Sequence, residues 1–93
     1  MRVIDFVNWI SNFTPTDKVR TSGSSAFKFV VNPSDHAQPD SDTCICFDGG
    51  ISVKELVRYV ALHNIEAYEM YKSSHGNICY NDAIHQRGEV IVS

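Results

Sequence analysis

Long hydrophobic runs are missing from this sequence, and their absence excludes one class of protein at once. No apolar stretch approaches the roughly 18 residues that a membrane-spanning helix needs. The N-terminal residues 1–8 contain a charge, Asp5, and an amide, Asn8, in their apolar run. This pattern is typical of an amphipathic helix and not of a signal peptide, so we expect a cytoplasmic location and no membrane partner.

Cysteine is also sparse, and its spacing is irregular. The chain has three cysteines, Cys44, Cys46 and Cys79, an odd number that does not form a disulfide framework. Together with the missing export signal, this pattern agrees with a protein of the reducing cytosol.

Positive charge is absent from the middle of the chain. Between Lys28 and Lys54 there is no other Lys or Arg. The same segment carries four aspartates, which are Asp35, Asp40, Asp42 and Asp48. The eight Lys and Arg residues of the whole chain are spread singly along the sequence. Because sequence-independent nucleic-acid binding needs several such residues on one surface, we expect no nucleic-acid partner.

Motifs for phosphate and calcium are absent as well. The turn Asp48-Gly49-Gly50 precedes an expected helix, whose first N–H groups favour anions, but Asp48 and Glu55 already place carboxylates there. The Asp40-x-Asp42 pair lacks the glycine and the distal glutamate of a calcium-binding EF-hand loop. We therefore predict an ordinary turn, a solvated loop and no cofactor.

Candidate catalytic pairs exist, but no catalytic motif contains them. Cys79 or Cys46 could act as a thiolate with His75 or His85 as its base. Asp82 and His85 could form an acid–base pair. No cysteine lies at a marked helix N-terminus, where a lowered thiol pKa would be expected. We predict that the protein is not an enzyme.

The best-defined element begins at residue 52. Ser52 and Glu55 have the spacing of a capping box, and Ile51 and Leu56 have the spacing of a hydrophobic staple. These two signals predict a helix that begins after Ser52. Its buried stripe is expected to consist of Val53, Leu56, Val57 and Val60.

The end of this helix has two interpretations. It can continue to Lys72 with Asn64 inside its apolar stripe, or it can end near His63 with Asn64 as a left-handed cap. We favour the second interpretation, because residues 65–71 then alternate as the first strand of a hairpin. That hairpin has its loop at 73–77 and its return strand at 78–80.

The remaining elements follow from periodicity and proline. Apolar residues at helical spacing predict a first helix over residues 2–13, which ends before Thr14-Pro15. Alternation predicts further strands at 26–31, at 43–47 and, as an optional last strand, at 89–92. Loops are expected at 16–25 and, with a polar and acidic composition, at 32–42.

Together these elements predict a single domain over residues 1–93, of the α+β class, in the order α-β-β-α-β-β. Helices and strands in such an order, joined by short connections, favour a two-layer arrangement. We expect two helices packed on one face of a mostly antiparallel sheet of four or five strands.

A metal site is one hypothesis for binding. Cys44 and Cys46 are two positions apart on an expected strand, so both thiols point to one face. His75 and Cys79 bracket the expected hairpin loop, and all four side chains could form a Cys₃His set of the kind that holds structural zinc. A Cys-x-Cys inside a strand, however, holds its thiols farther apart than chelation favours, and buried free cysteine is common.

Aromatic and acidic residues are the other candidates for a binding site. Trp9 lies beside the apolar stripe of the first helix, and Tyr68 and Met70 share one face of an expected strand. Tyr and Trp are enriched at protein interfaces. The face of Tyr68 and Met70 either meets a partner or covers the sheet beneath a helix. The candidate binding residues are Trp9, Tyr68, Met70, Asp35, Asp40 and Asp42.

The sequence therefore predicts a small non-catalytic protein-binding module, an inhibitor or adaptor that works by surface complementarity. Domains of this size and kind recur among phage and mobile-element accessory proteins that inhibit a host protein. The expected partner is another protein, and homodimer formation through a sheet edge stays open. The alternative is a zinc- or small-molecule-binding domain that uses Cys44, Cys46, His75 and Cys79.

Overall fold

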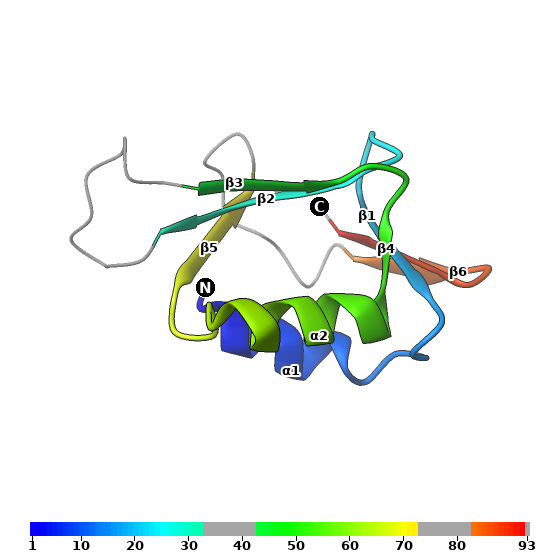
Figure 1. The fold of residues 1–93 in the computed structure, drawn as a ribbon. Helices are drawn as coiled ribbons and strands as arrows, with labels where there is room; N and C mark the ends of the chain where they lie inside the picture. Colours follow the sequence, from blue (N-terminus) through cyan, green and yellow to red (C-terminus); the bar gives the residue numbers. More distant parts are fainter. Residues whose placement is uncertain (33–42, 73–82, 93) are drawn as a thin grey trace.

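The fold combines two helices with two small β-sheets (Figure 1). The computed structural model describes residues 1–32, 43–72 and 83–92. In these ranges the elements are α1 (Val3–Ile10), β1 (Lys18–Thr21), β2 (Phe27–Asn32), β3 (Thr43–Phe47), β4 (Ile51–Ser52), α2 (Val53–His63), β5 (Glu69–Lys72), β6 (Ile84–Gln86) and β7 (Glu89–Val92).

The described strands form two sheets, with the orders β3-β2-β5 and β4-β1-β7-β6. All strand pairs are antiparallel except β1 with β7, which run parallel with Lys18 opposite Glu89 and Thr21 opposite Val92. The α+β class predicted from the sequence is confirmed. The expected single sheet is instead divided in two, and the chain passes between the two sheets after β1, after β3, through α2 and after β5.

The second of these passages is a tight turn. The Asp48-Gly49-Gly50 turn leads β3 into β4, and both glycines have positive φ. Gly50 lies so close to β1 that a Cβ atom there would be 2.8 Å from the carbonyl oxygen of Val19. The turn therefore needs glycine both for its backbone angles and for the close approach to β1.

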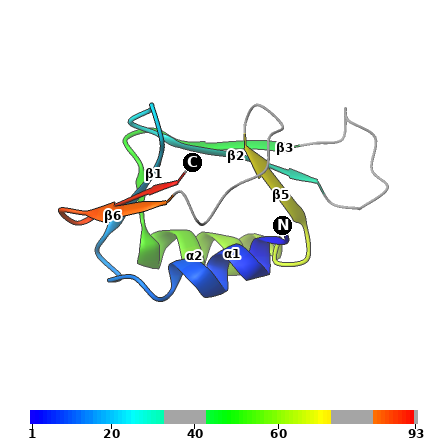
Figure 2. The ribbon, with the colours of Figure 1, turned by 180° about the vertical axis from the view of Figure 1, so that it is seen from behind.

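Both helices cover the same face of the three-stranded sheet, as predicted; Figures 1 and 2 show this from opposite sides. Phe6 of α1 stacks on Phe27 of β2 with ring centroids 5.7 Å apart. Burial of these side chains between the layers supplies the main stabilisation of such a domain. The core consists of Val3, Phe6, Ile10, Val19, Phe27, Phe29, Val31, Ile45, Ile51, Val53, Leu56, Val60, Ile65, Met70, Val90 and Val92.

The start of α2 is where the sequence predicted it. The Ser52 hydroxyl oxygen accepts a hydrogen bond of 3.2 Å from the Glu55 N–H, which is the backbone half of the expected capping box. Ile51 and Leu56 are both part of the core, in agreement with the expected staple.

The first N–H groups of each helix are bonded to the segment that follows the other helix. Val53 of α2 donates to the carbonyl of Asp17 at 2.9 Å, and Val3 of α1 donates to the carbonyl of Tyr68 at 2.8 Å. The next N–H of each helix does the same, with Lys54 donating to Pro15 at 3.0 Å and Ile4 donating to Glu66 at 2.9 Å. The two helices are thus joined by reciprocal backbone capping.

The end of α2 confirms the favoured interpretation. The helix ends at His63, and Asn64 has left-handed angles, φ 55° and ψ 43°. The strand that follows is shorter than expected, because residues 65–68 form a turn in which the Tyr68 N–H donates to the Ile65 carbonyl at 3.1 Å. β5 therefore begins at Glu69 and not at residue 65.

Three strands were not expected from the sequence, and one of them, β4, occupies the two residues just before α2. β1 lies inside the segment 16–25, which was predicted to be a loop, and β6 lies just before the expected last strand. β1 has one fully buried residue, Val19, and its hydrogen-bond partners come from β4 and β7. Because these partners are distant in the sequence, the segment itself shows no alternation of apolar and polar residues. The loop prediction was wrong for this reason. The strand expected at 89–92 is confirmed as β7.

Other boundaries differ by a few residues. α1 ends at Ile10, and residues 11–13 continue as turns in which the Phe13 N–H donates to the Ile10 carbonyl at 3.1 Å. Asn32 belongs to β2 and not to the acidic loop. The rest of that loop, 33–42, lies outside the described residues, as do the expected hairpin loop 73–77 and return strand 78–80.

Candidate functional site

β3 is an outer strand of the three-stranded sheet in the part of the chain that the structure describes. It pairs with β2 in continuous register, from Phe47 opposite Phe27 to Thr43 opposite Val31. Outer strands expose unpaired N–H and C=O groups, and natural proteins usually protect them with charges, proline or a bulge. β3 contains none of these, since its sequence is Thr-Cys-Ile-Cys-Phe. No described strand pairs with its outer edge, which is therefore a candidate site for the addition of another strand.

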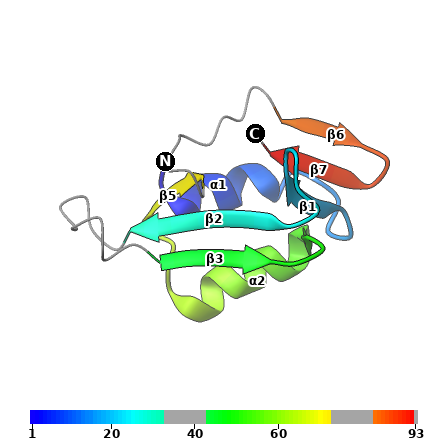
Figure 3. The ribbon, with the colours of Figure 1, turned by 90° about the horizontal axis from the view of Figure 1, so that it is seen from above.

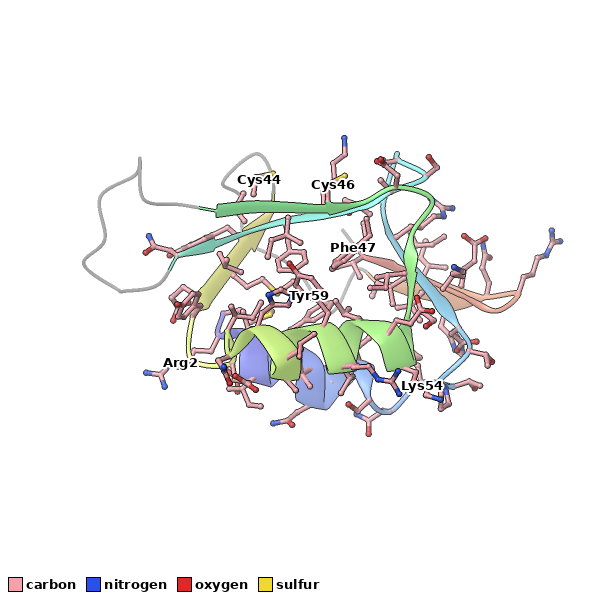
Figure 4. The ribbon with its side chains drawn as sticks, viewed as in Figure 1. Arg2, Cys44, Cys46, Phe47, Lys54 and Tyr59 are labelled. Atoms are coloured by element: carbon pink, nitrogen blue, oxygen red, sulfur yellow. The ribbon has the colours of Figure 1, made fainter. Side chains whose placement is uncertain are left out.

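A row of aromatic rings lies beneath this edge. Phe47 of β3 and Tyr59 of α2 point toward each other between the layers (Figure 4). Their rings meet edge to face, with centroids 5.0 Å apart and planes at 89°. The Tyr59 ring lies 4.1 Å from the ring of His63, one turn further along α2. We call Phe47, Tyr59 and His63 the aromatic ledge.

The aromatic ledge is partly open to solvent. Phe47 and Tyr59 are half-buried, and His63 is exposed. Viewed from above the sheet, α2 extends beyond the outer side of β3 (Figure 3). A segment added to β3 at the usual strand spacing of about 4.8 Å would consequently lie over α2 and cover these rings.

The ledge is also held in place from the core side. The Phe47 ring lies 6.5 Å from that of Phe27 and 6.3 Å from that of Phe29, which are both buried. Aromatic contacts of this kind fix ring orientation in addition to burying apolar area. The aromatic ledge is therefore a preformed surface.

The opposite face of β3 carries two thiols. Cys44 and Cys46 are exposed and point away from the helices (Figure 4). The Cys46 thiol donates a hydrogen bond of 3.4 Å to Oδ1 of Asp48. Local desolvation, together with this hydrogen bond and the negative charge of Asp48, raises the pKa of Cys46 above its ordinary value. A raised pKa favours the protonated thiol over the thiolate, which is the nucleophilic form.

The metal hypothesis depends on residues that lie partly outside the described ranges. Cys44 and Cys46 share one face of β3, as predicted, whereas His75 and Cys79 lie outside the described residues. Among the described residues, no three His, Cys, Asp or Glu side chains form a group that could hold a metal ion.

The other candidate binding residues fall in different places. Met70 is 1% exposed and belongs to the core. The interpretation that places Met70 on an exposed face for a partner is therefore wrong, and the alternative, a covered face, applies to this residue. Tyr68 is half-buried against the core. Trp9 is half-buried as well, with its ring 5.1 Å from that of Phe13. The three loop aspartates, Asp35, Asp40 and Asp42, lie outside the described residues.

The sequence did not indicate the residue that pairs with His85. Oδ2 of Asp17 accepts a hydrogen bond of 2.8 Å from Nε2 of His85. Asp82, which the sequence offered as a possible partner of His85, lies outside the described residues. His85 is on β6 and Cys46 is on β3, in the other sheet, so the structure does not bring this candidate nucleophile and base together. The Asp17 pairing has no signal in the sequence, because it joins residues 68 positions apart.

The start of α2 has no free backbone donors for an anion among its first three residues. The N–H groups of Val53 and Lys54 are bonded to carbonyls, and that of Glu55 is bonded to Ser52. This agrees with the prediction of an ordinary turn into a capped helix.

No helix in the described ranges is long and apolar enough to cross a membrane. Comparison of the chain with protein-family models, curated proteins and solved structures gives no match.

Proposed function

We propose that this protein is a non-catalytic protein-binding module that captures an extended segment of another protein along β3. The observation that supports this proposal is the outer edge of β3, which pairs with no other described strand and lies above the aromatic ledge. Strand addition of this kind gains affinity from main-chain hydrogen bonds and specificity from alternate side chains. By occupying the segment, the module would inhibit its partner or connect it to other proteins.

The geometry favours a particular kind of segment. In an extended chain, every second side chain points to the same face. One set would point down onto Phe47, Tyr59 and His63, where aromatic and branched apolar side chains fit best. The other set would lie beside Cys44 and Cys46, which face solvent. We therefore expect a segment of alternating apolar and small polar residues.

A second copy of this chain fits the edge less well. Antiparallel pairing of β3 with β3 of another copy would place both α2 helices on the same side of the joined sheet. Because α2 extends beyond β3 (Figure 3), the two helices would compete for the same space. An extended segment of another protein has no such helix. We therefore propose a different protein as the occupant of the β3 edge.

Selection from a displayed library of random peptides tests the proposal with identified ligands. We expect the selected peptides to alternate in polarity and to slow hydrogen exchange at the amides of residues 43–47. Tyr59→Ala should weaken binding about tenfold, or about 1.4 kcal/mol. Leu62→Ala is the matched control, since it truncates a 73% exposed side chain on the same helix. The affinity of this variant should stay at the wild-type value.

Two results would overturn the proposal. One is a selection without enrichment, or with peptides that leave exchange at 43–47 unchanged. The other is a stable dimer in sedimentation experiments that becomes monomeric in Tyr59→Ala, which would make a second copy the occupant of the edge.

A further inference from the structure

Two shallow grooves adjoin near the start of α2. The first, with a volume of about 430 Å³, has apolar walls from Phe13, Val53 and Val57, and we call it the apolar groove. The second, of about 400 Å³, is lined by Lys18, Lys54 and Arg58 and is the basic groove. Pro15 and Lys54 line both grooves, so the two form one continuous surface.

The basic groove gathers charges that are far apart in the sequence. The Lys and Arg residues stand singly in the sequence, which predicted no basic patch, yet the fold brings Lys18 of β1 beside Lys54 and Arg58 of α2. Among the residues that the structure describes, Glu55 is the only acidic one that lines this groove. The groove therefore has three positive groups against one carboxylate.

These three cations are available to a ligand. In the described part of the chain, Lys18, Lys54 and Arg58 form no ion pair and no side-chain hydrogen bond. Arg20, also on β1, differs because its Nε donates to Glu89 at 2.8 Å. Since the N–H groups of Val53 and Lys54 are bonded to backbone carbonyls, recognition of an anion here must come from the side chains.

We propose that this surface binds an acidic segment of a protein, with a large apolar side chain in the apolar groove and carboxylates facing Lys18, Lys54 and Arg58. Charge complementarity of this kind selects partners and increases the rate of association. The adjoining apolar walls supply the desolvated contact that a purely ionic site lacks. In Figure 4, Lys54 lies at the start of α2, away from Phe47 and Tyr59, so this site is separate from the β3 edge.

A nucleic acid fits the same surface less well. Nucleic-acid binding proteins commonly neutralise about 6–10 phosphates along a continuous track. The basic groove has three cations and a carboxylate, and its neighbour is apolar. An acidic peptide needs only a few carboxylates next to one apolar side chain, which is what the two grooves offer together.

An array of synthetic blocked peptides provides a direct test. Each peptide has one Leu, Phe or Ile flanked by Asp and Glu in varied spacing, and two control sets replace the acids by Asn and Gln or the apolar residue by Ser. We expect the best acidic peptides to bind more tightly as the salt concentration falls. Backbone NMR signals of Phe13, Lys54, Val57 and Arg58 should shift on binding. Both control sets should bind at least tenfold more weakly.

Charge reversal identifies the residues responsible. The double variant Lys54→Glu/Arg58→Glu should lose at least tenfold in affinity for the best acidic peptide. Arg2→Glu/Lys28→Glu changes the net charge equally at exposed positions outside the grooves and should bind as the wild type does. Thermal unfolding of both variants checks that they are folded.

Three outcomes would overturn this inference. Equal loss of affinity in the two double variants would indicate a non-specific charge effect. Absence of any acidic peptide that binds better than its amide control would exclude the basic groove as a carboxylate site. Tighter binding of a single-stranded oligonucleotide at the same residues would assign the surface to nucleic acid.

Discussion

The carboxylate of Asp17 accepts hydrogen bonds from Nε2 of His85 at 2.8 Å and from the Thr14 N–H at 3.2 Å, and Asp17 is 6% exposed. Its backbone carbonyl accepts from Val53 at the start of α2. One buried residue thus joins the loop after α1, the start of α2 and β6.

We expect Asp17→Ala to lower the free energy of unfolding by about 2 kcal/mol, because it removes a buried, charged acceptor that two hydrogen bonds reach. His85→Ala should cost less, since the His85 side chain is 48% exposed and Thr14 still bonds the carboxylate. Urea unfolding at neutral pH measures both. Asp5→Ala, at an exposed acid on α1, is the control. Equal costs for the first two variants would contradict the role assigned to Asp17.

The cap of α2 gives a second prediction. Ser52→Ala removes the acceptor of the Glu55 N–H and should cost about 1 kcal/mol of stability. Ser52→Asp keeps an acceptor at the same position and should restore most of that loss. A thermal unfolding series of the three proteins checks this, and an unrestored Ser52→Asp variant would show that the cost has another origin.

Gly49 and Gly50 allow a matched comparison at neighbouring positions. Both have positive φ, 76° and 84°, so alanine is strained at either one. A Cβ at Gly49 meets nothing within 4 Å, whereas one at Gly50 lies 2.8 Å from the Val19 carbonyl oxygen. Gly50→Ala should therefore cost roughly 1–3 kcal/mol more than Gly49→Ala in chemical unfolding. Equal costs would mean that β1 moves away without penalty.

The thiol of Cys46 gives a prediction about pH. Because the neighbouring Asp48 carboxylate contributes to its raised pKa, less thiolate is present at any given pH, and alkylation by iodoacetamide should be slow near neutrality. Asp48→Asn should move the midpoint of the alkylation profile to lower pH. The measurement uses Cys44→Ser/Cys79→Ser as background, so that Cys46 is the only cysteine. An unchanged midpoint would show that desolvation alone raises the pKa.

Local features of the fold could be predicted from the sequence. The capping signals of Ser52 and the left-handed cap at Asn64 involve neighbouring residues, and both are confirmed. The alternation of Phe27 and Phe29 likewise identified the buried face of β2. Each of these signals is contained in a few consecutive residues, which is why a single sequence reveals them.

Features that join distant residues could not be predicted. β1 looked like a loop because Val19 is its single fully buried side chain and its partners lie in β4 and β7. The ring contact of Phe47 with Tyr59 depends on how β3 is placed over α2. Neither the aromatic ledge nor the basic groove therefore has a signature in the sequence. The binding residues predicted from the sequence are mostly different ones.

The parallel pairing of β1 with β7 has a consequence for folding kinetics. Arg20 and Glu89, which are ion-paired across these strands, are 69 positions apart. Closing such a long loop costs entropy before any contact of the four-stranded sheet compensates for it. We expect this sheet to assemble late, after the local α2 helix, with an overall folding time of roughly milliseconds to seconds and not the microseconds typical of helical bundles.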